Sequence, residues 1–309
     1  MRMLPLLVCS VLAACVVSPR PTEGCTIRGN APPADVQLAE VACSRARQRF
    51  AATIGPPPAG TIILSDDQGL ATWTEGSHWT LTWPTSSRMQ TGTPGAPATT
   101  ELVTRQWADV LPHEIGHIML GAWLYSPGRD LAGDYATYLP DWVDEAVAIA
   151  MEPDSTRSFR LAQARRFTSP ALRDVLSSPH PRRTRGGAFS TSTVISRPCE
   201  SACDRERPRD TRVITSRVFR DGRSRVDTTY LAGDYPLEAD AVASFYTLSY
   251  ALWAYVEARG GRPAIEGLLT RLRRSPGDAR AVAGLPGLPD SLTATERDWH
   301  EWLAAEQRP

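Results

Sequence analysis

The sequence contains no lysine, and all 34 basic residues among its 309 are arginines. This absence excludes chemistry that depends on a lysine amine: the phosphate-binding loop of nucleotide hydrolases, Schiff-base catalysis and a Ser–Lys dyad. The Gly-Xaa-Ser-Xaa-Gly turn of many serine hydrolases is missing as well. The catalytic options therefore narrow toward the histidines, of which there are only five, and the carboxylates.

Net charge of one sign is also lacking, because 34 arginines balance 34 acidic residues. A neutral chain gives no reason to expect nucleic acid as a partner. The charge is nevertheless uneven, with 17 arginines against 6 acidic residues between positions 155 and 225. Such a run is typical of a solvated surface loop, and contact with an anionic surface, such as lipid headgroups or cell-wall polymer, is the alternative.

The only long apolar run lies at the start of the chain. Arg2 precedes LPLLVCSVLAAC, which is too short to span a bilayer and is typical of an export signal. Its end, Leu12-Ala13-Ala14-Cys15, resembles the bacterial lipobox. That resemblance implies a lipid anchor on Cys15 and a place in the bacterial cell envelope. Simple cleavage after a small residue, giving a secreted or periplasmic protein, is the alternative.

Cysteines are few, and four of the six follow the export signal. Export permits disulfides, and four cysteines allow three pairings. We expect Cys25–Cys43 and Cys199–Cys203, because the members of each pair lie close in sequence. A four-cysteine zinc site is disfavoured in an oxidising compartment.

The remaining pattern predicts an α+β fold. A helix is expected over 35–54, ended by Pro56-Pro57-Pro58. Strands are expected over 61–65, 70–74 and 78–83, the last with alternating Trp79, Leu81 and Trp83. The chain then divides into five parts. An export signal (1–15) and a tether (16–34) come first, followed by a sheet with two site helices (35–183). An arginine-rich insertion (184–238), with a hairpin turn at Asp221-Gly222, precedes a helical subdomain (239–309).

The stretch HEIGH places His113 and His117 four residues apart, with Glu114 between them. Positions i and i+4 share one face of a helix, so both imidazoles can converge on one zinc ion. Glu114 is rotated off that face and can act as general base toward a zinc-activated water. An ordinary helix bearing two incidental histidines is the alternative. Pro112 is tolerated in a first helical turn, so we expect the helix to start just before the motif, with Asp109 as its N-cap.

A third ligand is required. The metzincin pattern fails, because its glycine and histidine positions hold Leu120 and Trp123. The sequence WVDEAVA at 142–148 instead resembles the Trp-Leu-Asn-Glu-Gly-Phe-Ala pattern of gluzincin peptidases. That resemblance implies Glu145 as third ligand of one Zn²⁺ per chain. The 27 residues between His117 and Glu145 make a longer connection than is usual in gluzincins. Other carboxylates remain as rival ligands: Asp134, Asp141, Asp144 and Glu152.

The resemblance covers about 100–183 and 239–305 and extends to the Tyr-Xaa-Xaa-Ser helix of peptidase-MA-like domains. It implies a thermolysin-like zincin: a small mixed sheet packed on the HExxH helix, followed by helices. It also implies Tyr246 as the hydroxyl that binds the oxyanion, with Tyr250 as rival, and an edge strand at HWTLTW that takes up an extended peptide. His78 is expected at the surface, and His180 and His300 have no ligand spacing.

Together these features predict a zinc metallopeptidase of gluzincin type that acts on a peptide or protein substrate. A zinc hydrolase or lyase acting on a non-peptide envelope substrate is one alternative. A non-catalytic lipoprotein with a peptidase fold, binding an envelope partner, is the other. No feature of the sequence specifies an oligomeric state.

Overall fold

The computed structural model describes residues 24–66, 71–91, 99–125, 137–164, 171–178, 180, 189–191, 197–198, 212–220, 223–231 and 235–305. Their fold is α+β, as predicted: a small sheet near the N-terminus is followed by a mainly helical part. None of the helices in these segments has the length and hydropathy needed to cross a membrane.

The N-terminal sheet is mixed. Its strands are β1 (Cys25–Arg28), β2 (Gly60–Ser65), β3 (Ala71–Glu75) and β4 (His78–Pro84), in the spatial order β1-β2-β4-β3. β1, β2 and β4 run parallel, and β3 is antiparallel to β4. The strands begin and end within a few residues of the predicted ranges, because β-branched and aromatic residues fill them.

The prediction that HWTLTW forms the edge of this sheet is wrong. β4 pairs with β2 on one side and with β3 on the other, so it is an interior strand. Its indole rings Trp79 and Trp83 are buried, and so is Thr82 between them. β3 occupies the edge instead.

Helix α1 (Pro33–Thr53) covers β1 and β2 and matches the predicted helix at 35–54. A disulfide joins Cys25 of β1 to Cys43 of α1, which confirms the first predicted pairing. The predicted tether at 16–34 is therefore wrong from Cys25 onward: these residues pair in the sheet and begin the helix. Cys199 and Cys203 lie outside the described residues.

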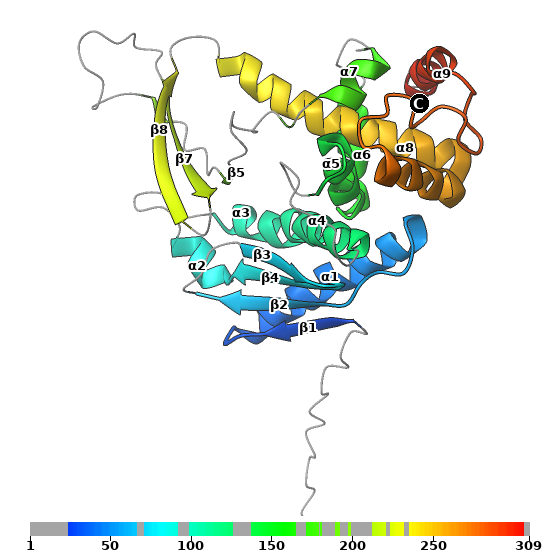
Figure 1. The fold of residues 1–309 in the computed structure, drawn as a ribbon. Coiled ribbons are helices and arrows are strands. Elements are labelled where there is room, and N and C mark those ends of the chain that lie inside the picture. The colour runs from blue at the N-terminus through cyan, green and yellow to red at the C-terminus, as the bar shows by residue number, and fades with distance from the viewer. Residues whose placement is uncertain are drawn as a thin grey trace, which may run out of the picture.

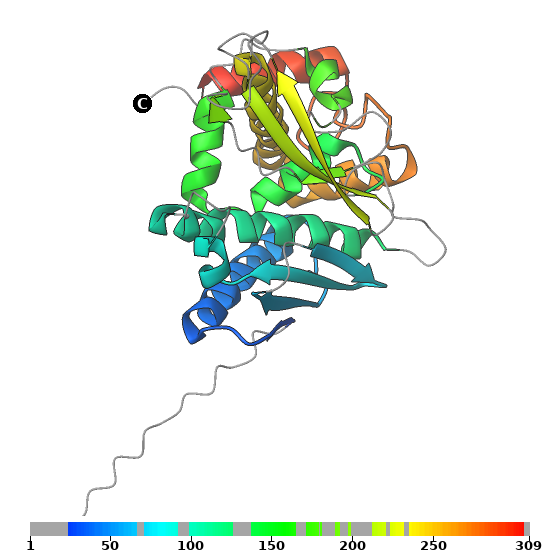
Figure 2. The ribbon, with the colours of Figure 1, turned by 90° about the vertical axis from the view of Figure 1, so that its left-hand side faces the viewer.

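Helix α4 (Leu111–Leu124) forms the layer above the sheet (Figure 1). It packs on β3, β4 and α1 with one side and on α5 (Asp141–Ala150) with the other. α5 in turn contacts α8 (Tyr235–Arg274). Figure 2 shows the same order from the side, with α4 between the sheet and the helical part. The other helices are α2 (Ser86–Thr91), α3 (Thr100–Arg105), α6 (Asp154–Ala164), α7 (Leu172–Ser177) and α9 (Leu292–Ala305).

Helix α8 is two helices joined at a break. Gly261 has φ 60° and ψ −157°, which is not helical, and Pro263 follows it. A positive φ is tolerated by glycine because it has no Cβ, so the chain bends here without strain. The first half faces α5 and α6, while the second half leads into the loop before α9.

The arginine-rich insertion contains short strands β5 (Phe189–Thr191) and β6 (Arg197–Pro198) and two longer strands, β7 (Arg212–Arg220) and β8 (Arg223–Leu231). β7 and β8 pair antiparallel, and Arg220 stands opposite Arg223. The pairing agrees with the predicted hairpin, and the predicted turn residues Asp221 and Gly222 lie outside the described residues.

Candidate metal centre

The HExxH motif lies on α4, which continues a longer helical run. α3 passes into a π-helical turn, η1 (Gln106–Val110), and then into α4 without interruption. The predicted fresh start of the helix before Pro112 is therefore wrong, and Asp109 lies inside the π turn and does not cap a helix.

Pro112 explains the π turn. Proline has no N–H, so it cannot bond the carbonyl of Ala108 four residues earlier. The backbone widens instead, with Leu111 N–H donating to Gln106 O. The carbonyl of Ala108 accepts a hydrogen bond from Arg45 Nη1 of α1 at 3.4 Å. The helix thus passes through the proline and reaches the motif.

Three side chains converge at the centre of the molecule. His113 Nε2 lies 3.1 Å from His117 Nε2 and 3.4 Å from Glu145 Oε2. His117 Nε2 lies 3.5 Å from Glu145 Oε1. Among the described residues, these three form a group whose ligand atoms all lie within 4.8 Å of one another and that could hold a metal ion.

The separations agree with one particular coordination geometry. In a tetrahedral site with bonds of about 2.0–2.1 Å, neighbouring ligand atoms stand about 3.3–3.4 Å apart. The separation of 3.1 Å between the two imidazole nitrogens is close to this size, and the carboxylate of Glu145 faces both rings, with Oε2 3.4 Å from His113 Nε2 and Oε1 3.5 Å from His117 Nε2. Two imidazole nitrogens and one carboxylate oxygen are also a donor set that zinc accepts, so the residues present fit this metal.

Glu145 sits on a helix with no exposed side. All ten residues of α5 are buried, and Glu145 is fully buried. A buried carboxylate must be compensated, and here imidazoles of His113, His117 and His180 surround it. The close approach of α4 to α5 depends on Gly116, because a Cβ there would stand only 2.7 Å from Ala148 Cα.

The electrostatics reflect this crowding. Burial would raise the pKa of Glu145, but the surrounding imidazoles outweigh burial and hold that pKa well below its usual value. Burial would likewise lower the pKa of His113, yet hydrogen bonds to Glu145 and Glu152 raise it. For His117, burial prevails and lowers the pKa.

The rival carboxylates have other partners. Asp144 accepts hydrogen bonds from Thr137 N at 3.1 Å and Thr137 Oγ1 at 2.8 Å. Asp141 accepts from the backbone N–H of His180 at 2.7 Å. Glu152 contacts His113 from behind, with Oε1 2.9 Å from Nδ1. Asp134 lies outside the described residues.

The two residues predicted to be catalytic come from α4 and α8. Glu114, half-buried, follows His113 on α4. Tyr246 of α8 is half-buried, and its ring centroid stands 6.2 Å from that of His113. Its hydroxyl lies 3.1 Å from His180 Nε2. Its rival Tyr250 instead lies 3.5 Å from Arg157 Nη1.

Sequence reasoning missed His180. The residue is buried, and its Nε2 lies 3.4 Å from Glu145 Oε1 and close to the Tyr246 hydroxyl. It stands alone between Pro179 and Pro181, with no ligand spacing to reveal it. The one feature of the sequence that could have pointed to His180 is that histidine is a rare residue type here, with five in the chain.

In comparisons with known proteins, no family model, no curated protein and no solved structure matches the chain. The chemistry of the centre is therefore inferred from its own residues.

The other two histidines are remote from the group, as predicted. His78 is exposed at the start of β4, with Nε2 3.1 Å from Thr61 Oγ1. His300 lies on α9 beside the ring of Trp299.

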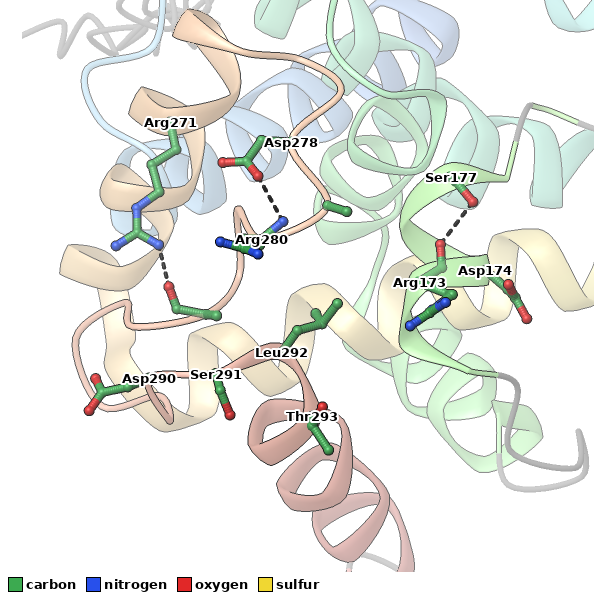
Figure 3. Close-up of a pocket in the computed structure, with 12 residues that line it drawn as sticks. Arg173, Asp174, Ser177, Arg271, Asp278, Arg280, Asp290, Ser291, Leu292 and Thr293 are labelled. Atoms are coloured by element: carbon green, nitrogen blue, oxygen red, sulfur yellow. Dashed lines mark hydrogen bonds between the residues drawn. The ribbon is translucent and has the colours of Figure 1, made fainter.

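A hollow of about 1050 Å³ opens elsewhere, between α7, the end of α8 and the start of α9 (Figure 3). Positively charged arginines and negatively charged aspartates line it. His113, His117 and Glu145 are not among the lining residues. Its Arg271 already donates hydrogen bonds to the loop before α9, with Nη1 bonded to Ala283 O and Nη2 2.9 Å from Gly284 O. The hollow and the metal centre are separate features.

Proposed function

We propose that the protein is a zinc-dependent hydrolase of gluzincin type, acting as a peptidase. The observation that carries the proposal is the spacing of His113, His117 and Glu145, which suits a tetrahedral ion with one position left for solvent or substrate. Glu114 beside the first ligand supplies the base that such a site needs.

The zinc ion, when bound, supplies a Lewis acid that polarises a carbonyl and makes water acidic. The protein supplies the rest. His113 and His117 bind as neutral imidazoles, and Glu152 fixes the ring of His113 through Nδ1. Glu114 accepts the proton of the attacking water and passes it to the leaving group.

Tyr246 is proposed to donate its hydroxyl to the oxyanion that forms on the attacked carbonyl. His180 contacts that hydroxyl and holds it on the side of the group that α8 faces. Peptide as substrate follows from the resemblance to gluzincins and from the edge position of β3 in the sheet. β3 packs beside α4, and an extended segment can add to such an edge through backbone hydrogen bonds.

Glu114→Gln tests the proposal. The variant should retain about one zinc per chain, measured by elemental analysis, since Glu114 is not a ligand. Its turnover of a peptide library should fall about 10²–10⁴-fold, because the proton acceptor is gone. Undiminished cleavage would remove Glu114 from the chemistry. If the wild-type protein takes up no stoichiometric zinc, the proposal of a zinc-dependent hydrolase is wrong. If it binds zinc but cleaves no peptide, the substrate is not a peptide.

A further inference from the structure

Arg160 of α6 contacts two different neighbours of the metal centre. Its Nε lies 2.8 Å from Glu152 Oε2 and its Nη2 lies 2.8 Å from Glu152 Oε1, so the guanidinium holds both carboxylate oxygens. The same guanidinium lies over the ring of Tyr246, with its central carbon 5.7 Å from the ring centroid. Arg160 therefore joins the end of α5 to α8.

Both neighbours lead to ligands. Glu152 Oε1, one of the two oxygens that Arg160 holds, is the atom 2.9 Å from His113 Nδ1. On the other side, Tyr246 contacts His180, whose Nε2 lies 3.4 Å from Glu145 Oε1. A continuous chain of contacts thus runs from the first ligand through Arg160 to the third.

We propose that Arg160 is a positioning residue of the metal centre: it fixes Glu152 behind His113 and holds the ring of Tyr246 in place. The proposal rests on the proposed function, because the centre it serves is the zinc site. Arg160 binds neither metal nor substrate in this role.

The planar guanidinium is suited to this task. Its two parallel N–H bonds fix both the position and the rotation of a carboxylate, which a lysine ammonium cannot do. Glu152 is 3% exposed at its side chain, so without Arg160 its charge would lie buried with less compensation. The carboxylate would then turn, and the imidazole that it orients would turn with it.

Arg157 provides a matched control. It lies one turn earlier on α6 and contacts another tyrosine of α8, with Nη1 3.5 Å from Tyr250 Oη. Its carboxylate partner is Asp154, which is 92% exposed. Arg157 thus shares the helix and the kinds of partner of Arg160, but these partners lead away from the ligands, so its loss should leave the centre intact.

The first measurement is the affinity for Zn²⁺ by competition with a chromogenic chelator. Arg160→Met should weaken binding about tenfold, the lower end of the range for loss of an outer partner. Arg160→Lys should give a smaller loss, and Arg157→Met should stay within about twofold of wild type. In a Glu152→Gln background, Arg160→Met should add little, because its effect passes through Glu152. With Co²⁺ in place of Zn²⁺, the visible spectrum should shift for Arg160→Met alone.

A second measurement does not need a metal. In the metal-free protein, the Nδ1 resonance of the His113 ring should move in Arg160→Met and remain in Arg157→Met. Unchanged His113 resonances, or unchanged zinc affinity, would overturn the role of Arg160. If the wild-type protein has no affinity for zinc, the proposed function is wrong. The His113 resonance would then be the measurement that tests the role of Arg160. If Arg160→Met does not fold, Arg160→Lys gives the same comparison.

Discussion

Asp144 and Glu145 are neighbours in the sequence and both are fully buried, yet their carboxylates serve different ends. Consecutive residues of a helix are rotated by about 100° around its axis, so the two side chains leave α5 in different directions. Glu145 faces the histidines, whereas Asp144 faces the chain entering the helix and accepts two hydrogen bonds from Thr137. The pattern WVDEAVA thus holds one residue for the metal centre and one for the fold.

Replacing each carboxylate separately should show that Glu145 serves zinc binding and Asp144 serves the stability of the fold. Glu145→Ala should weaken zinc binding by more than the ~10–100-fold typical of an outer partner, since a ligand is lost. Asp144→Ala should leave zinc affinity near wild type but reduce the free energy of unfolding by about 1–3 kcal/mol, because buried donors of Thr137 lose their acceptor. Chelator competition and urea unfolding measure the two quantities. The reverse order of zinc affinities would make Asp144 the ligand.

Residues near the metal centre differ in how far the sequence can predict them. His113 and His117 follow a spacing dictated by helix geometry, so the pattern indicates them directly, whereas Glu145 was predicted through the resemblance of WVDEAVA to the gluzincin pattern. Glu152 and His180 reach the group through the packing of other elements, and no local spacing encodes that packing. Single sequences predict ligands on one helix well and outer partners poorly for this reason.

At the level of elements, the centre depends on how closely α4 approaches α5. Gly116 lies between the two histidines in sequence and packs against Ala148 of α5 and against Met151, the residue that follows this helix. A methyl group at this position would meet backbone, which cannot move aside as a side chain can. The glycine of HEIGH therefore sets the distance between the helix with two of the proposed ligands and the helix with the third.

Gly116→Ala should separate the two helices. We expect a loss of about 1–3 kcal/mol in the free energy of unfolding from overpacking, together with weaker zinc binding as Glu145 moves away from His117. Gly277→Ala is the control, because a Cβ there meets nothing within 4 Å, and it should change stability by less than about 0.5 kcal/mol. Normal stability and normal zinc affinity in Gly116→Ala would contradict this account of the interface.

For the whole molecule, the order of elements was easier to predict than their neighbours. The range of α1 and the three strands from 60 to 84 follow from apolar period, proline and glycine signals. The position of β4 inside the sheet and the pairing of β1 do not, because both depend on contacts between segments far apart in sequence. The disulfide Cys25–Cys43 could be predicted because its two cysteines are separated by only 18 positions in the sequence.

Export and anchoring remain proposals that one cysteine can test. If Cys15 carries a lipid, Cys15→Ser should shift the protein from the membrane fraction to the soluble fraction of the expressing bacterium, since a single hydroxyl cannot replace the acyl chains. Immunoblots of the two fractions measure the shift, with Cys9→Ser as the control that should stay on the membrane. Persistent membrane association of Cys15→Ser would reject the lipid anchor.

The π turn at Gln106–Val110 also determines where the chain can lose length. Such a turn contains one residue more than an ordinary helical turn, and a deletion within it would rotate the two flanking helices by about 100° relative to each other. α4 is wedged between sheet and α5, whereas α3 buries only Val103 among its six residues. The rotation would therefore fall on α3, and such a deletion would require Pro112 to change as well, because the widened turn is what accommodates the proline before the first histidine.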